Sequence, residues 1–236
     1  MRLSLYLIIH LYNEDVMVES INIFGITSDI GGSFVKLLDN DSTTIFGYYS
    51  KNKLKADKIK SQYKNLTLKR IDISNPLTFA SYDIPNCEGL LYLVGKSFFS
   101  NNVFDFQINE LIEQFNLNIV SLISILKNIL SKDNCKLKKL VIVVSEIPNE
   151  IQSIYHLTKL LQVDSLMSLK RDLNNRGISV SAIKTSWVRT KMFHDFKKKF
   201  GNPTAKPISP KKIALMCINE FNNFHPFNVI QVIKTK

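Results

Sequence analysis

Tyr155 and Lys159 are the two side chains whose types and spacing best suit proton-transfer chemistry. They lie four residues apart at the start of an amphipathic segment, and this spacing puts both on one face of a helix. A phenol with a pKa of about 10 is otherwise a poor proton donor or acceptor at neutral pH. A neighbouring ammonium would favour the phenolate and lower the pKa of the tyrosine. The pair predicts a general acid; a buried tyrosine beside a surface lysine is the alternative.

A glycine-bearing turn near the start of the chain is suited to binding phosphate. Residues 25–32 follow a β-like run and precede a helical pattern. Such a turn lets the backbone approach a pyrophosphate, which then lies at the helix N-terminus. Similar turns also occur in α/β proteins that bind no nucleotide, so the turn alone leaves both possibilities open. Asp29, inside the turn, would repel a phosphate unless its carboxylate caps the helix, which Asp does well.

A chain that alternates strand and helix patterns must position these side chains. This alternation predicts one domain with a parallel sheet and right-handed crossovers. We expect strands at residues 21–24, 43–49, 66–73, 90–94, 140–144, 178–183 and 229–233. We expect helices at residues 33–38, 51–63, 104–130, 155–173 and 211–221. Residues 192–210 carry a run of three lysines and three prolines and are expected to form a loop or lid.

The composition limits the class of protein. The chain has 236 residues, 45% of them hydrophobic, which is enough for one well-packed core. Three scattered cysteines, Cys87, Cys135 and Cys217, and four separated histidines argue against a disulfide framework or a metal site. No apolar run is long enough to span a membrane, so we expect a cytoplasmic protein.

The first residues need separate treatment. Residues 3–12 form an apolar run, but no small-residue cleavage site follows it, so export is not expected. Residues 1–19 are expected to form an N-terminal extension to a domain at residues 20–236, and Met17 would be a natural alternative start.

Three segments together resemble the short-chain dehydrogenase/reductase family. The turn resembles the family's T-G-x-x-x-G-x-G: Gly25 and Gly31 match its first and third glycines. Phe24 replaces the threonine and Asp29 the middle glycine. The tyrosine–lysine pair matches the family's Y-x-x-x-K, and residues 178–192 resemble its I-x-V-N-A-I-x-P-G-x-V-x-T-x-M stretch. The resemblance implies a single-domain Rossmann fold, a doubly wound parallel sheet of about seven strands flanked by helices.

The resemblance also implies roles for the matched positions. The tyrosine protonates a carbonyl oxygen as hydride arrives, and the lysine also binds the nicotinamide ribose. Asn118 would support a proton relay to the lysine; a core amide is the alternative. The implied cofactor contacts are Gly25, Thr27, Ser28, Asp29, Ile30, Gly31, Asp72, Ile73, Gly95, Tyr155, Lys159, Val188 and Thr190.

The catalytic serine of the family has no unambiguous counterpart. The family places it at the end of the fifth strand, commonly about 13 residues before the tyrosine. Ser145 ends the expected strand only 10 residues before Tyr155, which a loop deletion would explain. Glu146 and Ser153 are the other candidates, and we favour Ser145.

The charge pattern favours NADP(H) over NAD(H). No acid ends the expected second strand, where an NAD-binding protein carries one for the ribose 2′-hydroxyl. Residues 51–70 hold eight Lys or Arg and one acid, so this segment carries +7 of the chain's net charge of +11. Ser50 and Lys51 could receive a 2′-phosphate; a solvated helix face is the alternative.

The sequence therefore predicts an NADPH-dependent reductase of a ketone or 3-oxoacyl group. The alternative is a degenerate family member that binds nucleotide or a protein partner without turnover, because Asp29, Tyr92 and Thr185-Ser186 depart from the family motifs. The substrate would be a small carbonyl or acyl compound, free or on an acidic carrier protein. The family resemblance implies a homodimer or homotetramer. Charge alone raises nucleic acid as a partner, but only five of the 31 basic residues are arginine and no recognition motif occurs.

Overall fold

The structure of the protein is a computed structural model. It describes residues 18–38, 42–75, 82–96, 104–145, 153–203 and 205–223, and the backbone of residues 228–231. Residues 1–17, including the alternative start at Met17, lie outside the described residues, as does Glu146.

Seven parallel strands form one sheet in the order β3-β2-β1-β4-β5-β6-β7. They are β1 (Ser20–Phe24), β2 (Thr44–Tyr49), β3 (Leu66–Arg70), β4 (Gly89–Tyr92), β5 (Lys139–Ser145), β6 (Ser179–Thr185) and β7 (Asn228–Gln231). The central strands are apolar on both faces, as a sheet covered on both sides requires. This order confirms the predicted Rossmann-type fold. The strand order reverses between β1 and β4, which leaves a crevice at their carboxyl ends.

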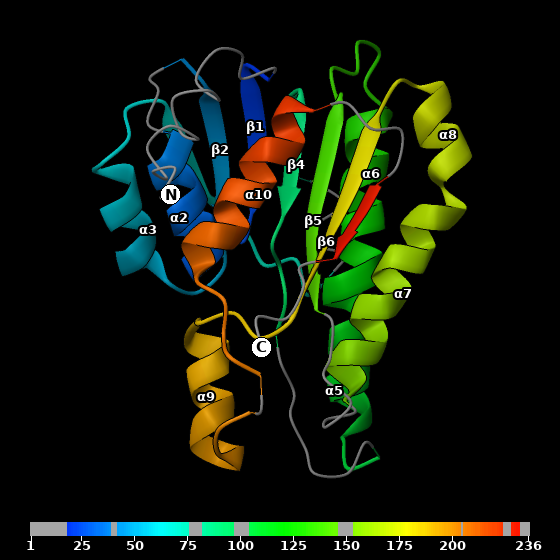
Figure 1. The fold of residues 1–236 in the computed structure, drawn as a ribbon. Helices are drawn as coiled ribbons and strands as arrows, with labels where there is room; N and C mark the ends of the chain where they lie inside the picture. Colours follow the sequence, from blue (N-terminus) through cyan, green and yellow to red (C-terminus); the bar gives the residue numbers. More distant parts are fainter. Residues whose placement is uncertain are drawn as a thin grey trace, which may run out of the picture.

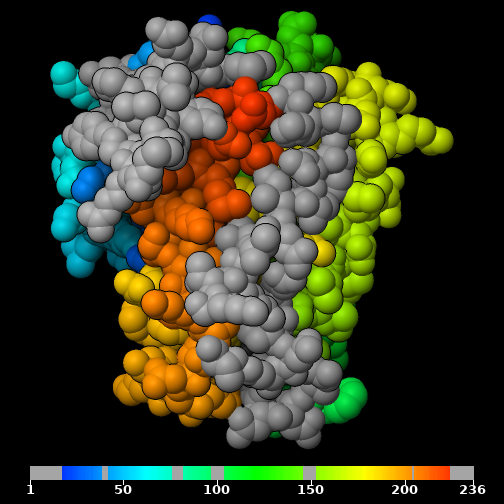
Figure 2. Space-filling model, in the orientation of Figure 1, coloured from blue at the N-terminus to red at the C-terminus, as the bar shows by residue number. Residues whose placement is uncertain are grey.

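Helices cover both faces of the sheet (Figure 1). On one face lie α2 (Asp29–Leu38), α3 (Lys53–Lys60) and α10 (Pro210–Asn222). The other side carries α5 (Ile108–Phe115), the π-helical turn η1 (Asn116–Val120), α6 (Ser121–Leu130), α7 (Ile154–Ser168) and α8 (Lys170–Asn175). The remaining helix, α9 (Lys191–Phe200), lies beyond the carboxyl ends of the strands. Figure 2 shows α10 in the middle of this side of the molecule, with α9 below it.

Two predicted helices are interrupted. The segment predicted as one helix over residues 104–130 contains η1, which separates α5 from α6. The segment at 155–173 is divided at Leu169 into α7 and α8. Apolar periodicity survives both interruptions, so a pattern of hydrophobic spacing cannot detect them. The π turn matters most, because Asn118 lies within it and such turns recur at functional sites.

The segment predicted as a loop at residues 192–210 begins with a helix. Phe193 and Phe196 are buried on α9, and Trp187 packs against both, with ring centroids 6.0 and 4.4 Å away. Lys197, Lys198 and Lys199 lie in the last turn of α9, where their positive charges interact favourably with the negative end of the helix dipole. The helix ends at Gly201, which has a φ of +86°. The loop was predicted from the three prolines, but all of them lie after the end of α9.

None of the helices in the described part of the chain has the length and apolar character needed to span a membrane.

Candidate active site

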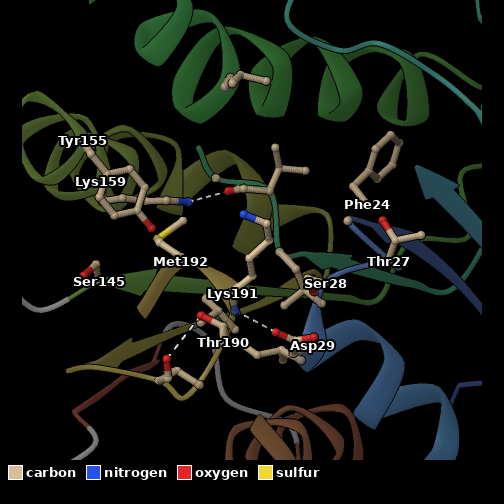
Figure 3. A pocket seen from close by; sticks show the side chains of 18 of the residues that line it. Phe24, Thr27, Ser28, Asp29, Ser145, Tyr155, Lys159, Thr190, Lys191 and Met192 are labelled. Atoms are coloured by element: carbon tan, nitrogen blue, oxygen red, sulfur yellow. Dashed lines mark hydrogen bonds between the residues drawn. The ribbon is translucent and has the colours of Figure 1, made fainter. Parts of the chain in front are cut away.

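A cavity of about 450 Å³ opens at the carboxyl edge of the sheet. Its wall includes the ends of β1, β2, β4, β5 and β6, the first turns of α2 and α7, and the start of α9. This is where open α/β sheets bind their ligands, and the volume suits a small-molecule site. Figure 3 shows the glycine-turn residues at one end of the cavity and Tyr155, Lys159 and Ser145 at the other.

Two glycines shape the turn at the first end. Gly25 has a φ of +87°, a conformation that favours glycine. A Cβ at Gly31 would lie 2.7 Å from the carbonyl oxygens of Gly25 and Ile26, so only glycine lets α2 start this close to β1. The Ser28 hydroxyl accepts a hydrogen bond from the Gly31 amide at 2.9 Å. The turn therefore brings backbone and a helix N-terminus to the cavity, as the motif predicted.

Asp29 does not cap α2, so that expectation was wrong. Its Oδ1 accepts a hydrogen bond from Lys55 Nζ at 2.6 Å, and its Oδ2 accepts one from the Lys191 amide at 3.0 Å (Figure 3). Asp29 is the first residue within the helix, and Ser28, the residue before it, makes the capping bond. The carboxylate consequently joins the N-termini of α2 and α9 across the end of the cavity.

Lys55 is a cavity residue that the sequence prediction missed. Ser50 lines the cavity, whereas Lys51 is exposed and lies outside its wall. Asn52 Oδ1 accepts a hydrogen bond from the Lys55 amide at 3.1 Å and caps the N-terminus of α3. Lys55 therefore lies in the first turn of this helix, and its ammonium reaches Asp29. The sequence did contain a signal for Lys55, because it lies four residues after Lys51 in a segment with a helical pattern.

The wall between β1 and β2 is aromatic. Phe24 stacks on Tyr48 with ring centroids 4.2 Å apart, and the Tyr48 hydroxyl donates to Asn22 Oδ1 at 3.0 Å. Asp72 and Ile73, for which a cofactor contact was predicted, also line the cavity. Asp72 accepts hydrogen bonds from the Ser74 hydroxyl and amide, which hold the pKa of its carboxyl below the usual value. These residues together form one side of the cavity.

The first two turns of α7 carry the tyrosine and the lysine. Ser153 caps the helix by accepting from the His156 amide at 3.3 Å. Lys159 Nζ lies 6.0 Å from the centre of the Tyr155 ring, so the two share one face as predicted. Gly95 packs against both, since a Cβ there would lie 3.2 Å from the Tyr155 hydroxyl and 3.4 Å from Lys159 Cε.

Burial dominates the protonation of this pair. It raises the pKa of Tyr155 above its usual value and lowers the pKa of Lys159 to about 7. The expected lowering of the tyrosine pKa by the ammonium is therefore not the net outcome. Lys159 Nζ donates instead to the Val94 carbonyl at 2.7 Å and to Gln162 Oε1 at 3.1 Å.

Asn118 lies behind the cavity, fully buried in η1. Its Nδ2 donates to Thr158 Oγ1 at 2.8 Å and to Gln114 Oε1 at 3.3 Å. Its backbone carbonyl accepts from Gln162 Nε2. Hydrogen bonds therefore connect the Asn118 backbone to Lys159 through Gln162, which the sequence prediction did not include.

Two serine candidates line the cavity. Ser145 ends β5, and Ser153 caps α7 at the same time as it lines the wall. The cap orients the buried Ser153 hydroxyl towards the helix, whereas Ser145 is partly exposed at the carboxyl end of β5, so Ser145 remains the favoured candidate for contact with a substrate.

The segment before α9 closes the cavity. Val188 bridges to Ile208, and the Thr190 hydroxyl donates to the Val188 carbonyl at 3.2 Å. Val188, Thr190 and Phe193 line the cavity, whereas Phe196 and Phe200 stack on each other outside the wall. Phe193 is therefore the one of these three phenylalanines that contributes to the apolar wall.

Comparison with known proteins shows which solved structures share this fold. No family model and no curated protein matches the sequence. Solved structures do match: a variant of the actinorhodin polyketide ketoreductase with NADPH has a TM-score of 0.77 at 13% identity, over 92% of this chain and 97% of that one. A short-chain dehydrogenase/reductase from Serratia marcescens has a TM-score of 0.74 at 15% identity, over 91% and 96%. BdcA in complex with NADPH has 0.71 at 15%, over 90% and 93%. The chain has the fold of the short-chain dehydrogenase/reductases.

Proposed function

We propose that this protein is an NADPH-dependent oxidoreductase of the short-chain dehydrogenase/reductase family that reduces a ketone or 3-oxoacyl group. The observation that carries the proposal is the placement of Tyr155 and Lys159, both packed on Gly95, at the end of a cavity whose other end is a glycine turn. Neither feature is specific alone, but their positions at the two ends of one crevice fit a dinucleotide and a carbonyl.

Residues at both ends fit the cofactor. The Gly25 turn and the α2 N-terminus would hold the diphosphate, with Thr190 on the opposite side. Asp72 and Ile73 would contact the adenine, and Val188 the nicotinamide. Lys55 and Ser50 supply the positive charge and hydroxyl that favour NADP(H). The Asp29 carboxylate opposes a phosphate at the glycine turn.

The chain's own residues would position the substrate and move the proton. When bound, NADPH supplies the hydride. Ser145 donates a hydrogen bond that holds the carbonyl oxygen beside the Tyr155 hydroxyl, and Tyr155 donates its proton to that oxygen. The nearby Lys159 ammonium stabilises the phenolate that remains. Met192 and Phe193 line the cavity with apolar side chains, which would help to exclude water from the reacting groups.

The direct test measures oxidation of NADPH by the purified protein with a panel of simple ketones and acetoacetyl compounds. We expect turnover with at least one, and a higher melting temperature with NADPH than with NADH at equal concentration. No thermal shift with either nucleotide would exclude both the reductase and a nucleotide-binding role.

Asp29 favours a second candidate, a protein that binds nucleotide without turnover. A carboxylate bonded across the diphosphate end at 2.6 and 3.0 Å must be displaced or accommodated by the cofactor. A clear thermal shift with NADPH combined with no oxidation by any carbonyl would support this candidate.

We further propose that the protein forms homodimers through the outer faces of α5 and α7. Large apolar side chains are exposed there: Ile108, Ile112, Leu157, Leu160 and Met167. Large exposed apolar side chains that gather on two helices in contact with each other are typical of an interface. Light scattering of the wild type and of Ile112→Glu tests it, because the charge should shift the protein towards monomer.

A further inference from the structure

Gln162 lies between Lys159 and the π turn. It is on α7, three residues after Lys159, and its side chain is fully buried. Its Oε1 accepts from Lys159 Nζ at 3.1 Å, and its Nε2 donates to the Asn118 carbonyl. A rotated amide would place donor against donor and acceptor against acceptor, so both contacts define the same orientation.

The position is one that an apolar residue would ordinarily fill. Val163 and Leu166 follow on the buried side of α7 and belong to the hydrophobic core. A buried amide destabilises the fold unless its polar atoms are bonded, and here both ends are. The chain therefore places a polar side chain in its core where the partner is the candidate catalytic lysine.

Lys159 has no carboxylate partner in the part of the chain that the structure describes. Its hydrogen bonds go to two neutral oxygens, of Val94 and Gln162. The titratable groups on the elements around it include Tyr155, His156 and Asp164 on its own helix, Tyr92 on β4, Lys96 after β4, Glu110 and Glu113 on α5, and Asp29 and Lys191 across the cavity. Lys96 and Glu113 pair with each other at 2.6 Å, Lys191 pairs with Asp195, and the Tyr92 hydroxyl bonds to Ser121. None of these groups supplies a negative charge to the buried nitrogen.

We propose that Gln162 is a positioning residue that holds the Lys159 side chain beside Tyr155 and keeps it in the ammonium form. An amide oxygen that accepts from an ammonium stabilises the charged form more than the neutral amine. The bond from Nε2 to Asn118 fixes the amide, so the oxygen stays aimed at Lys159. Any effect of Gln162 on turnover rests on the proposed reductase function, whereas its effect on the position and protonation of Lys159 does not.

The test titrates Lys159 directly in the full-length, cofactor-free protein. In protein with ¹³Cε-labelled lysine, Lys159 should titrate near pH 7, where burial places its pKa, and Lys159→Met identifies its signal by loss. Gln162→Leu should lower the pKa of Lys159 by about 1 unit, because an acceptor of the ammonium is removed. Gln162→Glu should raise it by about 1 unit or more, because a carboxylate replaces the amide.

Opposite shifts separate this role from simple packing. If the two substitutions shift the pKa of Lys159 in the same direction, or leave it unchanged, the proposal is wrong. Gln114→Leu is the matched control: it removes another buried glutamine, which bonds to Asn118 but not to Lys159. We expect it to lower the melting temperature without moving the Lys159 titration. Should Gln162→Leu fail to fold, Gln162→Met removes the same amide with an unbranched side chain.

Kinetics then connect the residue to turnover. The fall of kcat at high pH should move to lower pH in Gln162→Leu and to higher pH in Gln162→Glu, with KM for NADPH nearly unchanged. A protein that reduces no carbonyl but shows the opposite titration shifts refutes the reductase and leaves the positioning role intact. Turnover with an unmoved lysine titration refutes the positioning role alone.

Discussion

The two ends of the cavity are built on different physical principles. At the glycine-turn end, Asp29 and Lys55 form an ion pair whose side chains are about one third exposed, at 37% and 34%. At the other end, Tyr155 and Lys159 are 9% and 2% exposed, and the Lys159 ammonium donates hydrogen bonds to neutral oxygens. Solvent screens the first set of charges, whereas burial shifts the pKa values of the second set strongly.

This difference shows where the chain tolerates departures from the family motif. An exposed carboxylate can be neutralised by a nearby lysine and a helix amide, so Asp29 can occupy a glycine position. The buried end leaves no such freedom, because each polar atom needs its own partner. We therefore expect substitutions at the buried end to have larger effects.

The largest effect should come from Tyr155→Phe. Removing the proton donor should lower kcat by about 10³-fold, while the affinity for NADPH stays close to that of the wild type. NADPH oxidation and a nucleotide titration measure the two quantities. Tyr63→Phe, outside the cavity, is the control. Retained turnover in Tyr155→Phe would remove the tyrosine from the mechanism.

Gly31→Ala should disrupt the other end through sterics rather than charge. The new Cβ would lie 2.7 Å from two backbone carbonyl oxygens, so the turn must shift. We expect a loss of about 1–3 kcal/mol in the free energy of unfolding and weak NADPH binding. Gly32→Ala is the matched control: its nearest contact would be an ordinary 3.7 Å, and it should be neutral or stabilising by up to about 1 kcal/mol. Equal effects of the two substitutions would show that the close approach at Gly31 has no importance.

Stability should rise with pH because of Lys159. Its pKa is about 7 in the folded protein against 10.5 for an ordinary lysine, so the unfolded chain binds one more proton between these values. The free energy of unfolding should therefore increase across that window, by up to about 1.4 kcal/mol per pH unit. Melting temperatures between pH 7.5 and 9.5 should rise more for the wild type than for Lys159→Met. Parallel curves would contradict the lowered pKa of Lys159 in the folded protein.

The smallest effect should come from Asp29→Asn. Removing a carboxylate from the diphosphate end should tighten NADPH binding by about 10-fold at low salt, and less at high salt. Stability should change by less than about 1 kcal/mol, because the ion pair with Lys55 is partly exposed. Asp195→Asn, an exposed carboxylate on α9, is the control. Unchanged affinity in Asp29→Asn would place the diphosphate away from this residue.

Local pattern was sufficient for much of the fold and for the central pair. Apolar runs separated by helical periodicity predicted seven parallel strands, and the spacing of Tyr155 and Lys159 predicted a shared face. These features depend on neighbours within a few residues, which the chain displays directly. Helix α9 was not predicted, although Phe193 and Phe196 have helical spacing, because the prolines that follow it indicated a loop for the whole segment.

Hydrophobic period and glycine placement are local properties, and they were enough to predict the fold class and many of the residues that face the crevice. The partners of the charged and polar groups, in contrast, depend on how distant segments pack. The Asp29 carboxylate meets an amide 162 residues away, and Gln162 meets a carbonyl 44 residues away. Such contacts arise from the packing of separate elements, and the same packing sets the burial that lowers the pKa of Lys159.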